Sequence, residues 1–185
     1  AMEKRYKLKV GKSYDILTGY DLRLKRDLNR MWRSLSEDEP ELAVISPPCT
    51  PFSPLQQWNF PRMLFEKVAV MIGEGLHHVS IACKVAKWQH SHGRLFVFEH
   101  PKPSKAWDEP EMLELMMLPG VYVCVVDQCE YGLQVGSGLN KKTTQFVVNS
   151  IHIAAELQRR CSGEHQHEPL TNGRAAKAAI YPPEL

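Results

Sequence analysis

Four short apolar runs, separated by longer amphipathic segments, constrain the fold of this 185-residue chain most strongly. The apolar runs, each short enough for one buried strand, lie at residues 42–46, 94–100, 120–127 and 143–150. Segments with helical spacing of apolar residues lie at residues 22–36, 61–89, 109–118 and 151–161. Buried strands that alternate with helices are typical of βα units. We therefore expect an α/β fold with a mostly parallel sheet flanked by helices.

Boundary signals are clearest around the long segment 61–89. Pro61 suits the first turn of a helix, and Ser91, His92 and Gly93 suit its end. The last stretch is polar and has a weaker helical pattern at residues 173–180. No internal repeat is found, so we expect residues 1–185 to form a single domain.

Composition indicates a soluble intracellular protein. The chain is 43% hydrophobic, which is enough for one sizeable core, and it has neither an 18-residue apolar run nor a signal peptide. Its five cysteines are odd in number and widely spread, which indicates reduced thiols and no disulfide framework. We expect no membrane partner, and a nuclear location if the source is eukaryotic. The net charge of +2 permits a polyanionic partner without predicting one, and the oligomeric state is not predicted.

The first apolar run leads into an unusual loop, ISPPCTPFS at residues 45–53. Three prolines fix φ at three of five positions and remove three backbone donors, so the loop around Cys49 is stiff. Glu99 follows the second run, and Asp127 and Cys129 follow the third. Ligands of open α/β sheets bind at the carboxyl ends of the strands. Each residue alone has a simpler interpretation, as a buried thiol or a solvated acid, but together they favour a site at one sheet edge.

These motifs resemble those of the DNA cytosine-5 methyltransferases. SPPCTPFS is similar to the catalytic Pro-Cys loop of that family, and FVFEHP is similar to its next signature, a strand that ends in Glu. A divergent group from phages and mobile elements has SPPCT-x-FS, EHP, DQC-x-YG, a K-K-x-T strand and C-x-G-x-H-x-H in this order. The resemblance spans roughly residues 14–183 and implies a Rossmann-like, methyltransferase-like fold.

The resemblance implies roles for individual residues. Cys49 would add as a thiolate to C6 of cytosine, and Glu99 would contact the N3 edge and supply a proton. The base would be rotated out of DNA to reach them. KKTTQ stands where the family has Gln-x-Arg-x-Arg. The residues expected to contact the substrate are Ser46, Pro48, Ser53, Lys141, Lys142 and Thr144.

The family's cofactor is S-adenosylmethionine, bound at a Phe-x-Gly-x-Gly turn after the first strand. No such turn precedes Cys49, and only Asp15 and Asp21 could contact adenosine. The chain is then truncated at the N-terminus, binds the cofactor differently, or does not methylate. GSGLNKKT at residues 136–143 lacks the contiguous Gly-Lys-Ser/Thr of a phosphate loop, so we expect a glycine-rich hairpin connection there.

A second group of residues has the composition of a metal site. Cys161, His165 and His167 lie within CSGEHQH, and Cys129 lies in the DQC turn. Two thiolates and two imidazoles suit tetrahedral, structural Zn²⁺, which would anchor the C-terminal segment 161–185. The alternative is a polar, histidine-rich surface loop.

Three classes of function follow. The first is an enzyme, or enzyme-derived domain, that acts on or binds DNA through Cys49 and Glu99. The second is a catalytically inactive, zinc-stabilised module that binds nucleic acid or protein. The third is a cysteine hydrolase that uses Cys49 with a histidine such as His100, for which no family-specific signature is present.

Overall fold

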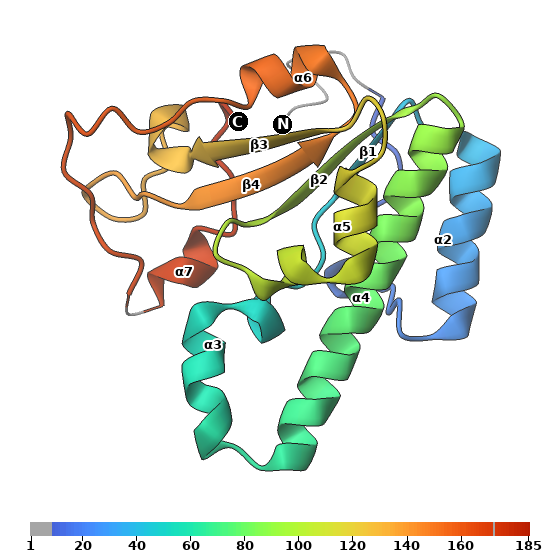
Figure 1. Ribbon diagram of the computed structural model, residues 1–185, viewed down its shortest axis with the longest axis horizontal. Helices are drawn as coiled ribbons and strands as arrows, with labels where there is room; N and C mark the ends of the chain where they lie inside the picture. Colours follow the sequence, from blue (N-terminus) through green and yellow to red (C-terminus); the bar gives the residue numbers. More distant parts are fainter. Residues whose placement is uncertain (1–8, 172) are drawn as a thin grey trace. The chain divides into compact units, whose positions relative to one another are not determined.

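The computed structural model describes residues 9–171 and 173–185 (Figure 1). Residues up to Glu41 form one compact unit, and residues from Leu42 onward form a second. The α-helices are α2 (Lys25–Asp38), α3 (Pro54–Asn59), α4 (Phe65–Ser91), α5 (Pro110–Met116), α6 (Ile151–Glu156) and α7 (Arg174–Lys177). The strands are β1 (Leu42–Ile45), β2 (Leu95–Pro101), β3 (Tyr122–Asp127) and β4 (Thr143–Val148). Short 3-10 helices are η1 (Ile16–Thr18), η2 (Thr50–Phe52), η3 (Phe60–Arg62), η4 (Lys105–Asp108) and η5 (Gln128–Tyr131).

The second unit contains one four-stranded sheet in the order β1-β2-β4-β3. β1 and β2 pair in parallel, whereas β4 pairs antiparallel with both β2 and β3. The sheet and its flanking helices confirm the α/β prediction, but the expectation of a mostly parallel sheet was wrong, because the sheet is mixed. The reason lies between β3 and β4, where η5 and a glycine-rich turn replace the helix that a parallel crossover needs.

Successive side chains of β2 point to opposite faces of the sheet, and both faces are covered by other parts of the chain. On one face, Phe96 lies against His90 of α4, and Phe98 lies against Trp107 of η4. On the other face, Val97 packs with a cluster that α6 covers (Figure 1). The buried members of this cluster are Cys124, Val126, Tyr131, Phe146, Val148, Ala154 and Leu157. The core therefore lies on both sides of β2 and β4, the two central strands.

Of the helices, α4 and α6 differ most from their predicted bounds. Pro61 lies in η3, and α4 begins only at Phe65 because Met63 and Leu64 are extended. α4 ends at Ser91 as expected, with Gly93 in the left-handed region at φ 68°. α6 stops at Glu156, five residues before its predicted end, because the following segment folds back onto the end of β3.

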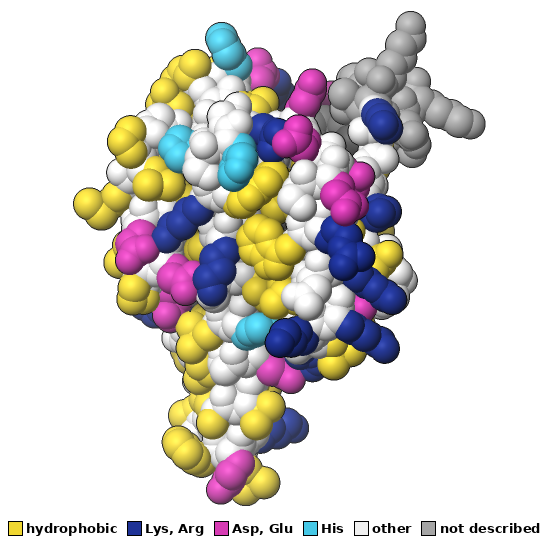
Figure 2. All heavy atoms as spheres, turned by 90° about the vertical axis from the view of Figure 1, so that its right-hand side faces the viewer, with side chains coloured by type: hydrophobic (Ala, Val, Ile, Leu, Met, Phe, Trp, Pro, Cys, Tyr) yellow, Lys and Arg dark blue, Asp and Glu magenta, His cyan; other side chains and the backbone are white. Residues whose placement is uncertain are grey.

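The first half of α4 and all of α3 carry exposed apolar side chains. Figure 2 shows them gathered at the lower end of the molecule, where α3 and the first turns of α4 lie. Trp58, Leu64 and Phe65 are each more than 70% exposed. α4 has the length and hydropathy of a membrane span, but the core helices of soluble proteins share these properties.

Gly75 permits a close approach between α4 and the turn that follows Cys49. A Cβ atom at this position would lie 2.9 Å from both Phe52 Cε2 and Pro51 Cγ. Both neighbours are buried, so neither can move aside freely. The glycine thus allows α4 to support the proline loop directly.

We predict that Gly75→Ala destabilises the protein by about 1–3 kcal/mol, the usual cost of overpacking a core. Gly73→Ala in the same helix is the matched control, because its added methyl group would meet nothing within 4 Å. That substitution should stabilise the helix by about 0.5–1 kcal/mol. Urea denaturation of both variants measures the difference. Equal stability of the two variants would show that α4 does not constrain the loop.

Candidate active site and metal centre

The proline loop holds Cys49 at the carboxyl end of β1. β1 ends at Ile45, and η2 begins at Thr50 and contains the buried residues Pro51 and Phe52. The amide of Phe52 donates to the carbonyl of Cys49 over 3.1 Å. Cys49 itself is only partly buried. The loop is therefore anchored by the apolar packing of Pro51 and Phe52, while Cys49 remains partly exposed.

Glu99 lies in β2, on the sheet face opposite α4, and only 6% of it is exposed. Its carboxyl group forms hydrogen bonds with the side chains of Tyr181 and Ser46. Oε1 of Glu99 is buried and has no hydrogen-bond partner among the described residues. A buried acceptor atom without a partner is costly, and such atoms are found at sites that receive a ligand.

Cys49, Glu99 and Lys142 interact electrostatically. Burial raises the pKa of the Cys49 thiol, the charge of Glu99 raises it further, and Lys142 lowers it. Burial also raises the pKa of Glu99, against the opposing effects of Tyr181, Lys142 and Ser46. Burial lowers the pKa of Lys142, although Glu99 and Cys49 favour its charged form. The structure therefore brings together the two residues expected to be catalytic, with a cation beside them.

Tyr181 is a member of this cluster that the sequence did not indicate. Its hydroxyl group hydrogen bonds with Glu99 and Ser46, and burial raises its pKa, so it keeps its proton and can donate. Nζ of Lys142 lies 4.7 Å from the centre of the Tyr181 ring and donates to the carbonyl of Ala178 over 3.1 Å. No spacing rule links residue 181 to residue 99. Only the folded chain reveals the pair.

The other residues expected to contact substrate have different positions. Pro48 is exposed in the loop. Ser53 caps α3 by accepting a hydrogen bond from the amide of Gln56 over 3.2 Å. Thr144 is buried in β4 and accepts a hydrogen bond from Gln128 over 2.8 Å. Lys141 is exposed, with Nζ 3.9 Å from a carboxylate oxygen of Asp127.

His100 lies on the sheet face opposite Glu99, because neighbouring strand residues point to opposite sides. Its ring contacts those of Phe52 and Trp107, and its two nitrogens have no hydrogen-bond partners in the part of the chain that the structure describes. Burial lowers its pKa to about 4, so the ring is neutral at physiological pH. This buried position argues against a catalytic pair between Cys49 and His100.

Asp15 and Asp21, the residues expected near adenosine, lie in the first unit. The Asp15 carboxylate caps η1 by accepting a hydrogen bond from the amide of Leu17 over 2.7 Å. The Asp21 carboxylate accepts two hydrogen bonds from the Arg23 side chain, each 2.9 Å long. Both acids thus have local structural partners.

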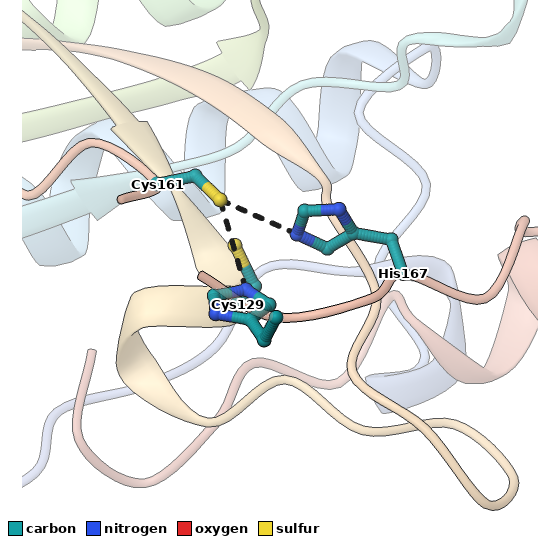
Figure 3. Close-up of side chains that lie close together, drawn as sticks. Cys129, Cys161 and His167 are labelled. Carbon is teal, nitrogen blue, oxygen red and sulfur yellow. Dashed lines mark hydrogen bonds between the residues drawn. The ribbon is translucent and has the colours of Figure 1, made fainter. Parts of the chain in front are cut away.

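The four predicted metal ligands form a second cluster. Cys129 comes from η5, and Cys161, His165 and His167 come from the segment after α6. Their ligand atoms all lie within 4.8 Å of one another. Sγ of Cys161 lies 3.4 Å from Nε2 of His167 and 3.6 Å from Nε2 of His165. Figure 3 shows Cys129, Cys161 and His167 pointing toward one another. This group could hold a metal ion.

The chemistry of the four donors fits a cation. Burial, together with a hydrogen bond and the charge of Cys161, raises the pKa of Cys129 to about 11. The buried Cys129 thiol therefore resists losing its proton, and a divalent cation beside it would reverse that preference. The two imidazoles complete a set of four ligands with soft and borderline donors.

Asp127 joins this cluster to the sheet. Its carboxylate, only 1% exposed, accepts hydrogen bonds from Nε of Arg160 over 2.9 Å and from the amide of Cys161 over 3.0 Å. It also accepts one from the hydroxyl of Thr143. Burial would raise the pKa of Asp127, but these hydrogen bonds lower it to about 2. The carboxylate therefore stays charged and fixes Cys161 opposite Cys129.

Comparisons with known proteins identify no family. The chain matches no protein-family model. No curated protein and no solved structure matches it either. The resemblance to the cytosine-5 methyltransferases therefore depends on the ordered motifs alone, and function must be argued from the geometry of the two clusters.

We predict that the protein purified without added metal carries about one metal ion per chain, as four-ligand sites do. Cys161→Ser should lose the ion and lower the Tm, because metal binding contributes to folding stability. His152→Ala is the matched control, since this exposed histidine lies on α6 outside the cluster. Elemental analysis and thermal melting provide the readouts. A metal-free wild-type protein whose Tm is unchanged by chelator would contradict the prediction.

We also predict that Glu99→Gln raises the Tm at neutral pH. Because the pKa of Glu99 is raised in the folded state, ionisation destabilises the fold progressively as pH rises above the ordinary value of 4.5. Below that pH both states are protonated, so the advantage of the variant should disappear. Glu114→Gln, at a carboxyl group that is mostly exposed, should show no such trend. The test is the Tm of each variant, measured at about every pH unit between roughly pH 4 and pH 8.

Proposed function

We propose that the second unit acts on a cytosine base of DNA, with Cys49 as nucleophile and Glu99 as the acid at the base edge. The observation that carries this proposal is the electrostatic cluster of Cys49, Glu99 and Lys142 at the carboxyl ends of β1 and β2. A stiff loop, a buried acid and a nearby cation are what addition to an electron-poor ring requires.

The raised pKa of Glu99 suits the role of a proton donor. A carboxyl group that holds its proton can protonate N3 of cytosine while the thiolate adds to C6. The S–C6 bond forms as electrons move from the C5=C6 bond, which leaves C5 nucleophilic. Lys142 lies where it would stabilise the thiolate before attack and the carboxylate of Glu99 after proton transfer.

The direction of the strands also supports the resemblance. β1, β2 and β3 all run the same way, since β4 is antiparallel to both β2 and β3. Doubly wound sheets place their strands in the order 3-2-1-4-5-6. β1, β2 and β3 could correspond to the second half of such an order, with β4 inserted as an extra antiparallel strand. On this proposal the chain has a Rossmann-like half sheet.

The described residues do not fit S-adenosylmethionine. No strand precedes β1 between residues 9 and 41, and Asp15 and Asp21 already have local partners. We therefore assign to this chain the addition step and the proton transfers at the base, and no methyl transfer.

We also propose that the metal is Zn²⁺ and that its role is structural. Two cysteines and two histidines fill four positions and leave none for water, which distinguishes structural sites from catalytic ones. The same observation favours the second candidate function, an inactive zinc-stabilised module that binds nucleic acid or protein. The two candidates differ in one respect, which is whether Cys49 reacts with a base.

Hydrogen exchange at C5 tests that difference without any cofactor. When the thiolate adds to C6, C5 can take up a deuteron from D₂O. Loss of the original proton and of the thiolate then restores cytosine, labelled at C5. We predict that a cytosine-containing oligonucleotide gains deuterium at C5 in the presence of the protein. Cys49→Ala should abolish the gain, and Glu99→Gln should reduce it by roughly 10²–10⁴-fold, the usual contribution of acid catalysis. Mass spectrometry of the released nucleosides measures the label.

Two controls make the result decisive. Thymine in the same oligonucleotide carries a methyl group at C5 and should gain no label there. Tyr181→Ala is assayed beside the wild-type chain, because the Tyr181 hydroxyl group hydrogen bonds with the Glu99 carboxyl group, which would otherwise contact the base. Absence of exchange with both proteins, while zinc remains bound, would overturn the enzymatic proposal and leave the inactive module.

A further inference from the structure

The C-terminal tail, defined here by its described residues 168–171 and 173–185, connects the metal cluster to the Cys49–Glu99 site. It begins directly after His167 and carries Tyr181 onto Glu99. We propose that Tyr181 is an internal occupant of the base site, and that the tail is a strap whose release opens the site. The identity of the displaced ligand as a pyrimidine base depends on the proposed function, whereas the closure of the site by Tyr181 does not.

Tyr181 makes the types of contact that a cytosine base would make. It presents a planar six-membered ring, and its hydroxyl donates toward the Glu99 carboxyl group as an N–H or amino group at the base edge would. The ammonium group of Lys142 lies 4.7 Å from the ring centre, within the range of a cation–π contact. Glu99 and Lys142 therefore already hold one aromatic ring, and a second ring cannot occupy the same place.

The tail is held at its start and again around Ala178. Near its start, the amide of Glu168 donates to the carbonyl of Leu139 over 2.8 Å, and Asn140 donates to the carbonyl of Glu168 over 2.7 Å. Farther along, Lys142 donates to the carbonyl of Ala178, whose side chain packs in a small cluster with Leu133 and Val135. The first attachment lies next to the metal ligand His167, so loss of the metal would loosen it.

The described part of the tail combines its polar contacts with a few apolar ones. Ala178 and Pro182 are buried, Leu170 packs in the same small cluster as Ala178, and Leu185 packs against the cluster that α6 covers. Ile180, next to Tyr181, is 79% exposed. Segments with little apolar burial open at a small free-energy cost compared with the core. The tail contributes no residue to the pairings between β1, β2, β3 and β4, so the strap can open by separating these few apolar contacts while the sheet stays folded.

The reaction rate of Cys49 with iodoacetamide tests the strap in the folded protein. Tyr181→Ala should accelerate the reaction about tenfold, because losing one hydrogen bond shifts an opening equilibrium by up to roughly that factor. Tyr181→Phe keeps the ring but loses the hydroxyl group, so its rate should lie between those of the wild-type and alanine proteins. Peptide mapping by mass spectrometry assigns each label to its cysteine.

Two internal controls separate strap opening from general unfolding. Cys83 and Cys124 are buried in the core and should remain slow in every variant. Ile180→Ala, at the exposed neighbouring position, should react like the wild-type protein. The proposal is overturned if Tyr181→Ala leaves the Cys49 rate unchanged, or if Ile180→Ala accelerates it equally.

Metal removal provides an independent measurement. Chelator should accelerate labelling of Cys49 in the wild-type chain but add nothing in Tyr181→Ala, where the site is already open. An unchanged wild-type rate after proven metal loss would overturn the link between the metal and the strap. Faster labelling of Tyr181→Ala without C5 exchange would support the strap and reject only the nucleobase chemistry, so the two failures are distinguishable.

Discussion

Both clusters depend on the hydrogen bonds that the buried carboxylate of Asp127 accepts. It lies at the end of β3 and accepts hydrogen bonds from Thr143 at the start of β4 and from Arg160 and Cys161 after α6. One side chain thus joins the sheet to the segment that carries three of the four metal ligands. A buried charge of this kind is stable only when its partners remain in place. The tail and Tyr181 extend from that segment, so their position follows from the same carboxylate.

The sequence predicted the elements of the fold better than their arrangement. Apolar runs identified all four strands, because a buried strand has the same composition whichever way it runs. Direction depends on the connections. The signal for an antiparallel β4 lies between Asp127 and Thr143, where the sequence predicts a glycine-rich hairpin connection and no helix. The early end of α6 was not predictable from helical spacing, because the hydrogen bonds of Arg160 and Cys161 to Asp127 override it.

The two clusters were predictable to different degrees. Cys129 and the three ligands in CSGEHQH could be grouped from residue type alone, because soft donors in short spacing indicate a metal. Cys49 and Glu99 were connected by the family resemblance and by their positions at strand ends. Tyr181 was not predictable, since it lies in a polar segment without a motif and meets Glu99 only after the tail has folded back. The raised pKa values of Cys49 and Glu99 likewise arise from burial, which a sequence does not specify.

The position of β4 between β2 and β3 has a consequence for synthesis of the chain. β3 has no hydrogen-bonded neighbour in the sheet until β4 is available, and β4 ends only at Val148. During translation, β1 and β2 can pair first. β3 remains apolar and unpaired until β4 has been synthesised. Chains that pause between these strands expose a surface that favours aggregation. We therefore expect truncated products that end between Asp127 and Thr143 to depend on chaperones, whereas products that include β4 can complete the sheet.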